Sequence, residues 1–291
     1  MKYIFLINEF TIIKKKNLIC LRIKNYCEKN NLDYIFEYIN KDNEVEDALK
    51  KYQKTRNIII AVGGDGTINR VLNCIYTTNN ILGFIPYGTG NDFYKTIKEE
   101  YKNEITPTDV IKINNKLYIN SGCFGIDADV ANSKNIIKSK LIPKKLKYIV
   151  SLIIAVIKYK NRHLKISYEG KEENNNFATV AVMNGKYYGG GFKVSPKSKV
   201  NDGLINVLVA GNINKIKTIG LILKMKSDSH INSKFIKYFT CKNITVESNK
   251  EVKCNIDGEE LTNTLFKIEV LDKKIELYYN SDLINEVLGN T

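Results

Sequence analysis

The stretch Ala61-Val62-Gly63-Gly64-Asp65-Gly66-Thr67 decides the fold of this chain, because it joins a strand pattern to a helix pattern through glycines. The apolar run Ile58 to Val62 before it predicts a buried strand. After it, four apolar residues recur at helical spacing: Ile68, Val71, Leu72 and Ile75. The order strand, glycine loop, helix directs a helix N-terminus at a phosphate group.

A second loop, Pro86-Tyr87-Gly88-Thr89-Gly90-Asn91-Asp92, follows the next apolar run, Ile81 to Ile85. In an open α/β sheet, ligands bind at the carboxyl ends of the strands, and glycine lets backbone N–H groups approach phosphate oxygens. Each loop also carries one acid, Asp65 or Asp92. A carboxylate near a phosphate is favourable when a divalent cation lies between them, directly or through water. The two loops therefore predict a site for nucleotide phosphates and Mg²⁺.

An ordinary turn, a Rossmann site and a P-loop each account for these glycines less well. A tight left-handed turn accounts for one loop but not for a second, similar loop after the next strand. A Rossmann dinucleotide site needs glycine where Asn69 and Phe93 stand, and no glycine-rich loop ends in the Gly-Lys-Ser or Gly-Lys-Thr of a P-loop.

The first 120 or so residues alternate between strand and helix patterns. Strands are predicted at Tyr3 to Ile7 and Tyr34 to Ile39, and helices at Asn17 to Asn30 and Val45 to Lys54. Sequential strand, helix, strand units predict a mostly parallel sheet with right-handed crossovers.

After Gly125 the pattern changes to short alternating segments separated by turns, which predicts an antiparallel β-sandwich or barrel. The predicted strands are Leu164 to Tyr168, Phe177 to Met183, Leu204 to Val209, Ile244 to Glu247, Val252 to Ile256, Phe266 to Val270 and Ile275 to Tyr279. Helical insertions are expected at about Ser133 to Lys158 and Ile213 to Ser227, and a short helix at Asp282 to Leu288.

Composition excludes several classes of protein. The formal net charge is +14, but the basic residues are spread along the chain and lack an arginine-rich or aromatic-interleaved pattern, so nucleic acid is not expected as a partner. The six cysteines form no CxxC pair and the two histidines lie far apart, which argues against zinc. The longest apolar stretch, Tyr148 to Ile157, is shorter than the roughly 18 residues of a spanning helix. With no signal-peptide pattern at the start, we expect a cytoplasmic protein with free thiols.

Further motifs follow the two loops in order. They are Thr108-Asp109-Val110-Ile111-Lys112-Ile113, Gly125-Ile126-Asp127-Ala128, Tyr188 to Pro196 with its three glycines, Asn201-Asp202-Gly203-Leu204 and Asn255-Ile256-Asp257-Gly258-Glu259. Together with the loops they resemble the soluble lipid kinase family that includes bacterial diacylglycerol kinases and sphingosine kinases. The resemblance covers most of the chain.

The resemblance implies an architecture and an activity. Residues 1–125 are expected to form a nucleotide-binding α/β domain with a mostly parallel sheet, similar to NAD kinases and phosphofructokinases. Residues 126–280 are expected to form an antiparallel β-sandwich that binds lipid, with the tail 281–291 packing back on the first domain. The implied function is that of an ATP- and Mg²⁺-dependent lipid kinase of phospholipid biosynthesis. It would transfer the γ-phosphate to the hydroxyl of diacylglycerol or a related lipid in the cleft between the domains.

Roles for individual residues follow from the loops and from the resemblance. The nucleotide is expected to contact Gly63, Gly64, Asp65, Gly66, Thr67, Ile68, Asn69, Thr89 and Asn91. By resemblance, Asp109 joins Asp65 and Asp92 in an acidic network, and Glu259 or Asp257 is the base that deprotonates the lipid hydroxyl. A metal-binding turn is implied at Lys199, Asp202 and Leu204. The Asp-Gly pairs at 257–258 and 202–203 are also ordinary turn sequences.

Several alternatives stay open. NAD kinases and sugar kinases share the Gly-Gly-Asp-Gly motif. A lipid-binding or regulatory protein with impaired catalysis also fits, because Asn8 lacks the Pro and Gly that follow it in family members. Lysines flanking Tyr148 to Ile157 suit either docking on the anionic inner face of a membrane or a solvated helix face: Lys138, Lys140, Lys144, Lys145, Lys147, Lys158 and Lys160. A homodimer is a further open alternative.

Overall fold

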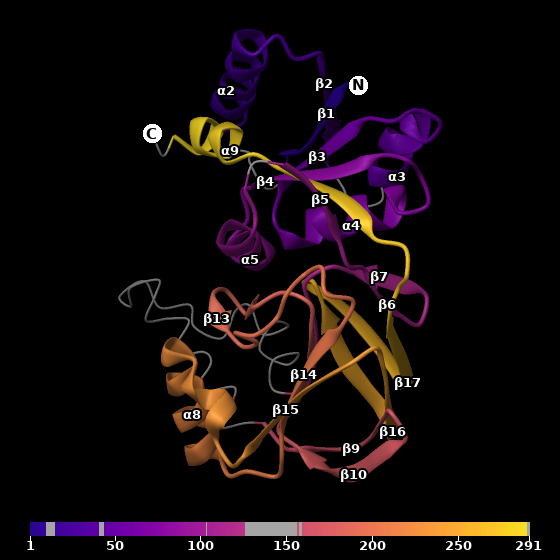
Figure 1. Ribbon diagram of the computed structural model, residues 1–291, viewed down its shortest axis with the longest axis vertical. Coiled ribbons are helices and arrows are strands. Elements are labelled where there is room, and N and C mark those ends of the chain that lie inside the picture. Colours follow the sequence, from indigo (N-terminus) through magenta and orange to yellow (C-terminus); the bar gives the residue numbers. More distant parts are fainter. Residues whose placement is uncertain (10–14, 41–43, 103, 126–155, 157–158, 290–291) are drawn as a thin grey trace.

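The computed structural model describes residues 1–289 except for 10–14, 41–43, 103, 126–155, 157 and 158. Two β-sheets form two domains that lie one above the other in Figure 1. The chain starts in the upper domain, builds the lower one and returns to the upper one at its C-terminal end (Figure 1).

The first sheet has six strands and is almost entirely parallel, as predicted. Its order is β2 (Tyr34–Ile39), β1 (Tyr3–Asn8), β3 (Ile58–Gly63), β4 (Ile81–Pro86), β18 (Ile275–Tyr279) and β5 (Glu104–Thr108). All neighbours pair in parallel except β18 and β5, which are antiparallel. The carboxyl ends of β3 and β4 therefore meet at one edge, where the two glycine loops begin.

Helices cover both faces of this sheet. α2 (Lys16–Lys29) and α9 (Ser281–Leu288) pack on one face, and α3 (Glu44–Leu49), α4 (Asp65–Ile75) and α5 (Asp92–Glu100) pack on the other. On β1, Phe5 contributes to the first of these cores and Leu6 to the second, because successive side chains point to opposite faces. The helix predicted to run to Lys54 ends at Leu49 and continues as a 3₁₀ turn, Lys50–Tyr52. The C-terminal helix α9 packs on the first sheet through Leu283 and Val287.

The placement of β18 corrects the expected division of the chain. Ile275 to Tyr279 was expected in the antiparallel domain, but it lies in the first sheet between β4 and β5. Conversely, β6 (Ile111–Ile113), β7 (Lys116–Tyr118) and β8 (Ser121–Gly125) belong to the second sheet, although residues up to 125 were assigned to the first domain. The local pattern of a strand fixes its buried face but not its partner strand.

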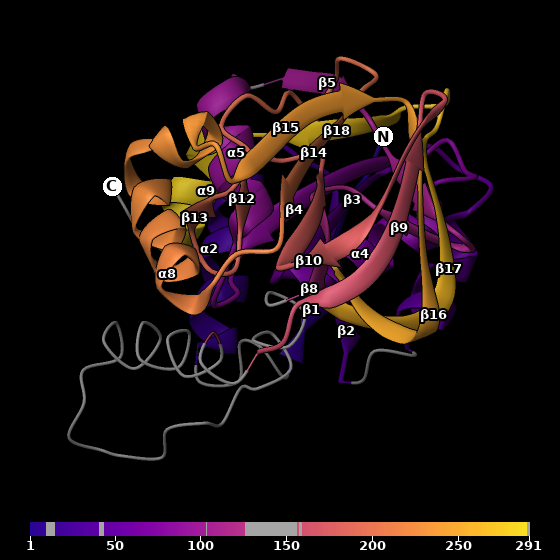
Figure 2. The same ribbon diagram turned by 90° about the horizontal axis from the view of Figure 1, so that it is seen from below.

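The second sheet is antiparallel, as predicted, and curves around its own core (Figure 2). Its order is β15 (Ile236–Cys241), β14 (Ile205–Ala210), β11 (Thr179–Met183), β8, β16 (Asn243–Ile256), β17 (Glu259–Val270), β6 and β7, with β9 (Arg162–Tyr168) and β10 (Lys171–Phe177) attached to β16. The two strands predicted within 244–256 form the single strand β16, which has a register shift between Glu247 and Val252. The parts of β16 before and after this shift pair with different strands, β9 and β8.

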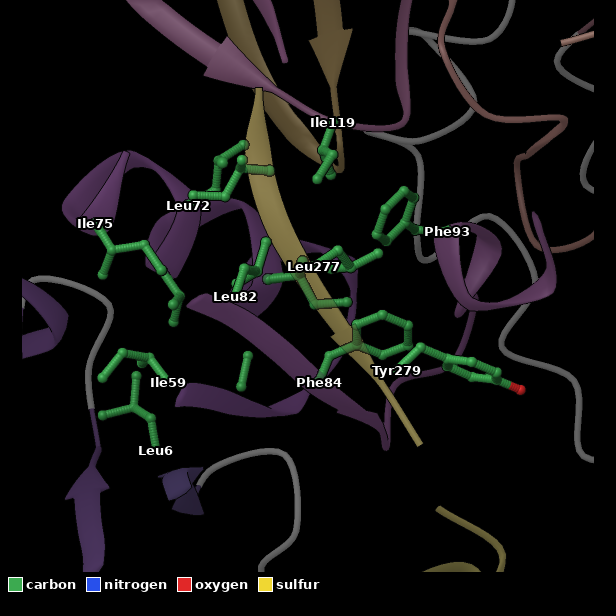
Figure 3. Packing of buried hydrophobic residues seen from close by; sticks show 14 of the residues in the cluster. Leu6, Ile59, Leu72, Ile75, Leu82, Phe84, Phe93, Ile119, Leu277 and Tyr279 are labelled. Atoms are coloured by element: carbon green, nitrogen blue, oxygen red, sulfur yellow. The ribbon is translucent and has the colours of Figure 1, made fainter. Parts of the chain in front are cut away.

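The two domains share part of one core. Ile119, which precedes β8, and Val200, which precedes β14, belong to the apolar cluster formed by α4, α5 and the first sheet. Figure 3 shows Ile119 in this cluster with Phe93 and Leu277. Shared burial of apolar surface holds the two domains against each other.

Two predictions concern helices of the second domain. The insertion expected at 213–227 is α8 (Lys215–Lys224), followed by a 3₁₀ turn at Met225–Ser227. The insertion expected at 133–158 falls, apart from Val156, outside the described residues. Over the described part of the chain, we find no helix with the length and apolar character needed to cross a membrane.

Candidate active site

The two glycine loops touch each other. A Cβ atom on Gly88 would lie 2.5 Å from the Cα of Gly64, so this approach requires glycine. The backbone N–H of Tyr87 donates to the carbonyl of Gly63 at 2.7 Å. The loops that the sequence predicts separately are thus one continuous surface at the carboxyl edge of β3 and β4.

The N-termini of α4 and α5 converge at this surface through Asp65. Its Oδ2 accepts the backbone N–H of Asp92 at 3.1 Å, and its Oδ1 accepts that of Phe93 at 3.2 Å. A Cβ on Gly90 would lie 3.2 Å from Oδ2 of Asp65 and 3.5 Å from Oδ2 of Asp92, so both carboxylates flank Gly90. Burial, and then the negative charge of Asp92, raises the pKa of the Asp65 carboxyl. Carboxylate oxygens are ligands of a hard cation such as Mg²⁺, and both oxygens of Asp65 also accept backbone N–H groups here.

Asp92 connects the second loop to the other domain. Its Oδ1 pairs with Nζ of Lys95 at 2.8 Å, and its Oδ2 accepts the backbone N–H of Gly190 at 2.8 Å. Gly190 lies in a turn between the short strands β12 (Tyr187–Tyr188) and β13 (Phe192–Lys193), where Gly189, Gly190 and Gly191 all have positive φ. Only glycine adopts such a run of left-handed conformations without strain. The contact between this turn and Asp92 was not predicted from the sequence.

Of the other predicted nucleotide contacts, Thr67, Thr89 and Asn91 belong to the loops or follow them directly, and Ile68 lies in the core. Thr67 is buried and accepts a hydrogen bond from Nδ2 of Asn8 at 3.2 Å, and Thr89 is exposed at the tip of the second loop. Asn91 has a left-handed backbone, with φ of 51°, and its Oδ1 accepts the N–H of Gly88 at 2.8 Å. In contrast, Ile68 packs in the core, so it supports the loop from behind.

Asn69 faces the second domain and bonds to Asp257. The Asp257 carboxylate is only 3% exposed and accepts four hydrogen bonds, at 2.8 to 3.2 Å. Nδ2 of Asn69 donates one of them, and the backbone N–H groups of Ile119, Asn120 and Ser121 donate the others. Burial outweighs these donors and raises the pKa of Asp257 to about 6. Through these hydrogen bonds, Asp257 links its own turn to α4 and to the start of β8 with the residues before it.

Glu259 is more accessible than Asp257. Its side chain is 28% exposed, and its Oε1 lies 3.0 Å from Nε of Arg70 on α4. Both residues line a groove of about 310 Å³ beside α4, together with Val45, Glu46, Asn69, Asn73, Cys74 and Lys116. Arg70 was missed in the sequence analysis, although its position one turn after Gly66 places it on the loop side of α4.

The structure places Asp109 with the predicted metal-binding turn. Asp109 is fully buried; its Oδ2 accepts the backbone N–H of Gly203 at 2.7 Å, and its Oδ1 lies 2.8 Å from Nζ of Lys274. The same ammonium group donates to the carbonyl of Asn201 at 2.6 Å. Desolvation, and then the charge of Asp109, raises the pKa of Asp202. The charge of Asp109 thus affects the pKa of Asp202, while the carboxylates of Asp65 and Asp92 form a separate pair.

The residues of this turn fit a cation only in part. Oδ1 of Asp202 accepts the N–H of Leu204 at 3.0 Å, and Lys274 already supplies a positive charge to Asp109. Among the described residues, no group of three or more His, Cys, Asp or Glu side chains is arranged to hold a metal ion. A metal ion at this turn would therefore depend on backbone carbonyls, such as those of Lys199 and Leu204, in addition to Asp202.

Comparisons with known proteins identify two matching families and several relatives. Residues 2–118 match the model of the diacylglycerol kinase catalytic domain, and residues 120–279 match that of the YegS C-terminal NAD kinase beta sandwich-like domain. A protein of Staphylococcus epidermidis named "Putative lipid kinase" is 28% identical over 243 residues, which are 78% of this chain and 78% of that protein. A Staphylococcus aureus protein with the same name is 28% identical over 249 residues, 80% of this chain and 81% of the relative.

Solved structures share the fold. The "Crystal structure of a putative diacylglycerol kinase from Bacillus anthracis str. Sterne" matches with a TM-score of 0.73 at 22% identity, over 97% of this chain and 96% of that chain. This similarity supports the two-domain fold.

Proposed function

Because the chain belongs to the diacylglycerol kinase family, we propose that it transfers the γ-phosphate of ATP to the hydroxyl of diacylglycerol or a related lipid. One observation carries the proposal. The two glycine loops meet at one sheet edge, and their two aspartates are joined to each other and to the glycine turn of the second domain. Phosphoryl transfer requires such a combination of phosphate-binding backbone and closely spaced charges.

The N-terminus of α4 is the proposed site for the nucleotide phosphates. Its N-cap residue is Gly64, which has no side chain to cap the helix, whereas the first N–H groups of α5 are already bonded to Asp65. Uncapped N–H groups at a helix N-terminus favour an anion. Asp65 and Asp92 would hold Mg²⁺ directly or through water, and this ion would neutralise charge on the transferring phosphoryl group.

The acceptor side is proposed to lie at Glu259 and Asp257. Asp257 is buried and accepts four hydrogen bonds from Asn69 and the segment 119–121, so we assign it to holding the turn in place. Glu259 is partly exposed and faces the groove, where its carboxylate would accept the proton of the lipid hydroxyl. Arg70 would orient this carboxylate through the pair at 3.0 Å.

The groove beside α4 suits the polar end of a lipid. Its lining includes Arg70, Lys116 and two asparagines, which match hydroxyl and ester oxygens better than an acyl chain. We therefore propose that the groove receives the head of the acceptor lipid, at the cytoplasmic face of a membrane.

The test is the transfer of label from γ-labelled ATP with Mg²⁺ into diacylglycerol dispersed in detergent, with NAD and a hexose phosphate as competing acceptors. The proposal predicts label in the lipid fraction only. Label in NAD or the sugar would favour the kinases of those acceptors, which share the Gly-Gly-Asp-Gly motif. No transfer to any acceptor by folded protein would favour a lipid-binding protein without catalysis.

A further inference from the structure

Helix α8 exposes two large apolar side chains on one face. Ile216 is 82% exposed and Leu223 is 60% exposed. They are seven residues apart, which places them on the same side of the helix two turns apart. Gly220 lies between them, and a Cβ built there would have no atom within 4 Å. Among the described residues, this face is therefore open at Ile216, Gly220 and Leu223.

The opposite face of α8 anchors the helix to the second domain. Leu221 is buried and packs with Ala178, Ala210 and Ile213. Thr218 is also buried, and its hydroxyl donates to the carbonyl of Asn214 at 3.1 Å. Figures 1 and 2 show α8 on the outside of the second domain, beside β13. The buried residues attach the helix to the second domain, so its apolar outer face lies at the protein surface.

Lysines of the helix itself flank the exposed face. Lys215, Lys217 and Lys224 are exposed, and the whole helix has no acidic residue. A helix with an apolar strip and flanking lysines is typical of segments that lie in the interface of a bilayer. Each lysine close to an anionic surface strengthens binding by about fivefold.

We propose that α8 docks this protein on an anionic lipid bilayer, with Ile216 and Leu223 inserted at the interface. A protein partner fits less well, because a stable protein interface buries about 800 Å² on each side. A helix of ten residues with two protruding side chains offers much less. The inference extends the proposed function, since a lipid kinase must reach its substrate, but docking is measured without turnover.

The test is co-sedimentation of the full chain, without ATP, with vesicles of phosphatidylcholine and phosphatidylglycerol in equal amounts. Vesicles of phosphatidylcholine alone serve as the comparison. The wild type should bind the anionic vesicles, and added salt should weaken this binding. The double variant Ile216→Glu and Leu223→Glu should bind at least about tenfold more weakly, as should Lys215→Glu with Lys217→Glu.

Two matched controls separate docking from general surface changes. Leu265→Glu alters another exposed apolar side chain, on β17, and Lys250→Glu alters an exposed lysine on β16. Both should bind like the wild type, and every variant should keep the wild-type unfolding midpoint because all the altered side chains are exposed.

Three results would overturn the proposal. They are wild-type binding by the α8 variants, equal binding of the wild type to both kinds of vesicle, and no binding to either. A dimer in solution that Ile216→Glu dissociates would instead assign the face to a second copy of the chain. In each case, activity on detergent-dispersed lipid would leave the proposed kinase function standing.

Discussion

The carboxylate of Asp65, at the start of α4, accepts the backbone N–H of Asp92, at the start of α5, at 3.1 Å. Asp65 also accepts the N–H of Phe93, so it caps α5 although it belongs to another helix. One side chain therefore sets the distance between the two loops and brings two carboxylates together. This double role determines what its substitution should do.

Asp65→Asn should abolish most phosphoryl transfer and cost less stability than Asp65→Ala, because its amide oxygen still accepts one of the two N–H groups while the charge is lost. Asp65→Ala should lose activity and also about 1 kcal/mol of unfolding free energy, the usual effect of losing a helix cap. Transfer rates and urea unfolding measure the two effects. Asp33→Asn, at an exposed surface pair, is the control. Full activity in Asp65→Asn would remove Asp65 from the catalytic site.

Gly88→Ala should distort both loops at once. Its Cβ would lie 2.5 Å from backbone of Gly64, which cannot move aside as a side chain can. We expect a loss of about 1–3 kcal/mol in stability, as in overpacked interiors, and weaker ATP binding. Gly211→Ala is the matched control, since a Cβ there meets no atom within 4 Å. ATP binding by calorimetry distinguishes the two variants, and equal affinities would mean that the contact between the loops does not shape the nucleotide site.

Asp257 should make stability depend on pH. Burial raises its pKa to about 6 in the folded protein, above the value of about 4 in an unfolded chain. The folded state therefore binds this proton more tightly, so the contribution of Asp257 to stability is present below about pH 4 and is lost as the pH rises to about 6. Urea unfolding between these pH values should show this decline in the wild type but not in Asp257→Asn. Equal slopes of unfolding free energy against pH in the two proteins would contradict the assignment of this pH dependence to Asp257.

Lys274→Met should destabilise the protein, because it leaves the fully buried carboxylate of Asp109 without its cation. Removing one partner of a buried pair costs about 3–5 kcal/mol, and we expect about 2 kcal/mol because Lys274 is partly exposed. The double variant with Asp109→Asn should recover part of this loss. If the losses of unfolding free energy in the two single variants sum to the loss in the double variant, the two side chains are not coupled. Urea unfolding measures all three values. Mg²⁺ added to Lys274→Met tests whether the ion can replace the ammonium group.

Local patterns were sufficient to predict the order of strands and helices around the glycine loops. Ile58 to Val62 and the helix after it carry their structure in their own periodicity, and the adjacency of the loops follows from parallel pairing. The strand Ile275 to Tyr279 alternates apolar and polar residues in a way that suits either sheet, so its insertion beside β4 was not predictable. Its partner strand depends on contacts formed by distant parts of the chain.

The same limit applies to the contacts of the candidate site, which depend on residues far apart in the sequence. Asp65 and Asp92 were identified because glycine loops have a local signature. The groups that bind Asp109 and Asp92 were not identified from the sequence. Lys274 is 165 residues from Asp109, and Gly190 is 98 residues from Asp92. Similarly, an Asp-Gly sequence at 257–258 predicts a turn, but only the fold reveals the three backbone N–H groups that bind Asp257.

The most direct test of the account is the rate of γ-phosphate transfer to diacylglycerol by Glu259→Gln, measured with saturating ATP and Mg²⁺. Glu260→Gln is the matched control, since Glu260 is the next residue of β17 and pairs with Lys253 instead of Arg70. If Glu259 accepts the proton of the lipid hydroxyl, its variant should be slower by about 10² to 10⁴, with unchanged ATP affinity and a normal rate for Glu260→Gln. A wild-type rate in Glu259→Gln would contradict the assignment of the catalytic groove.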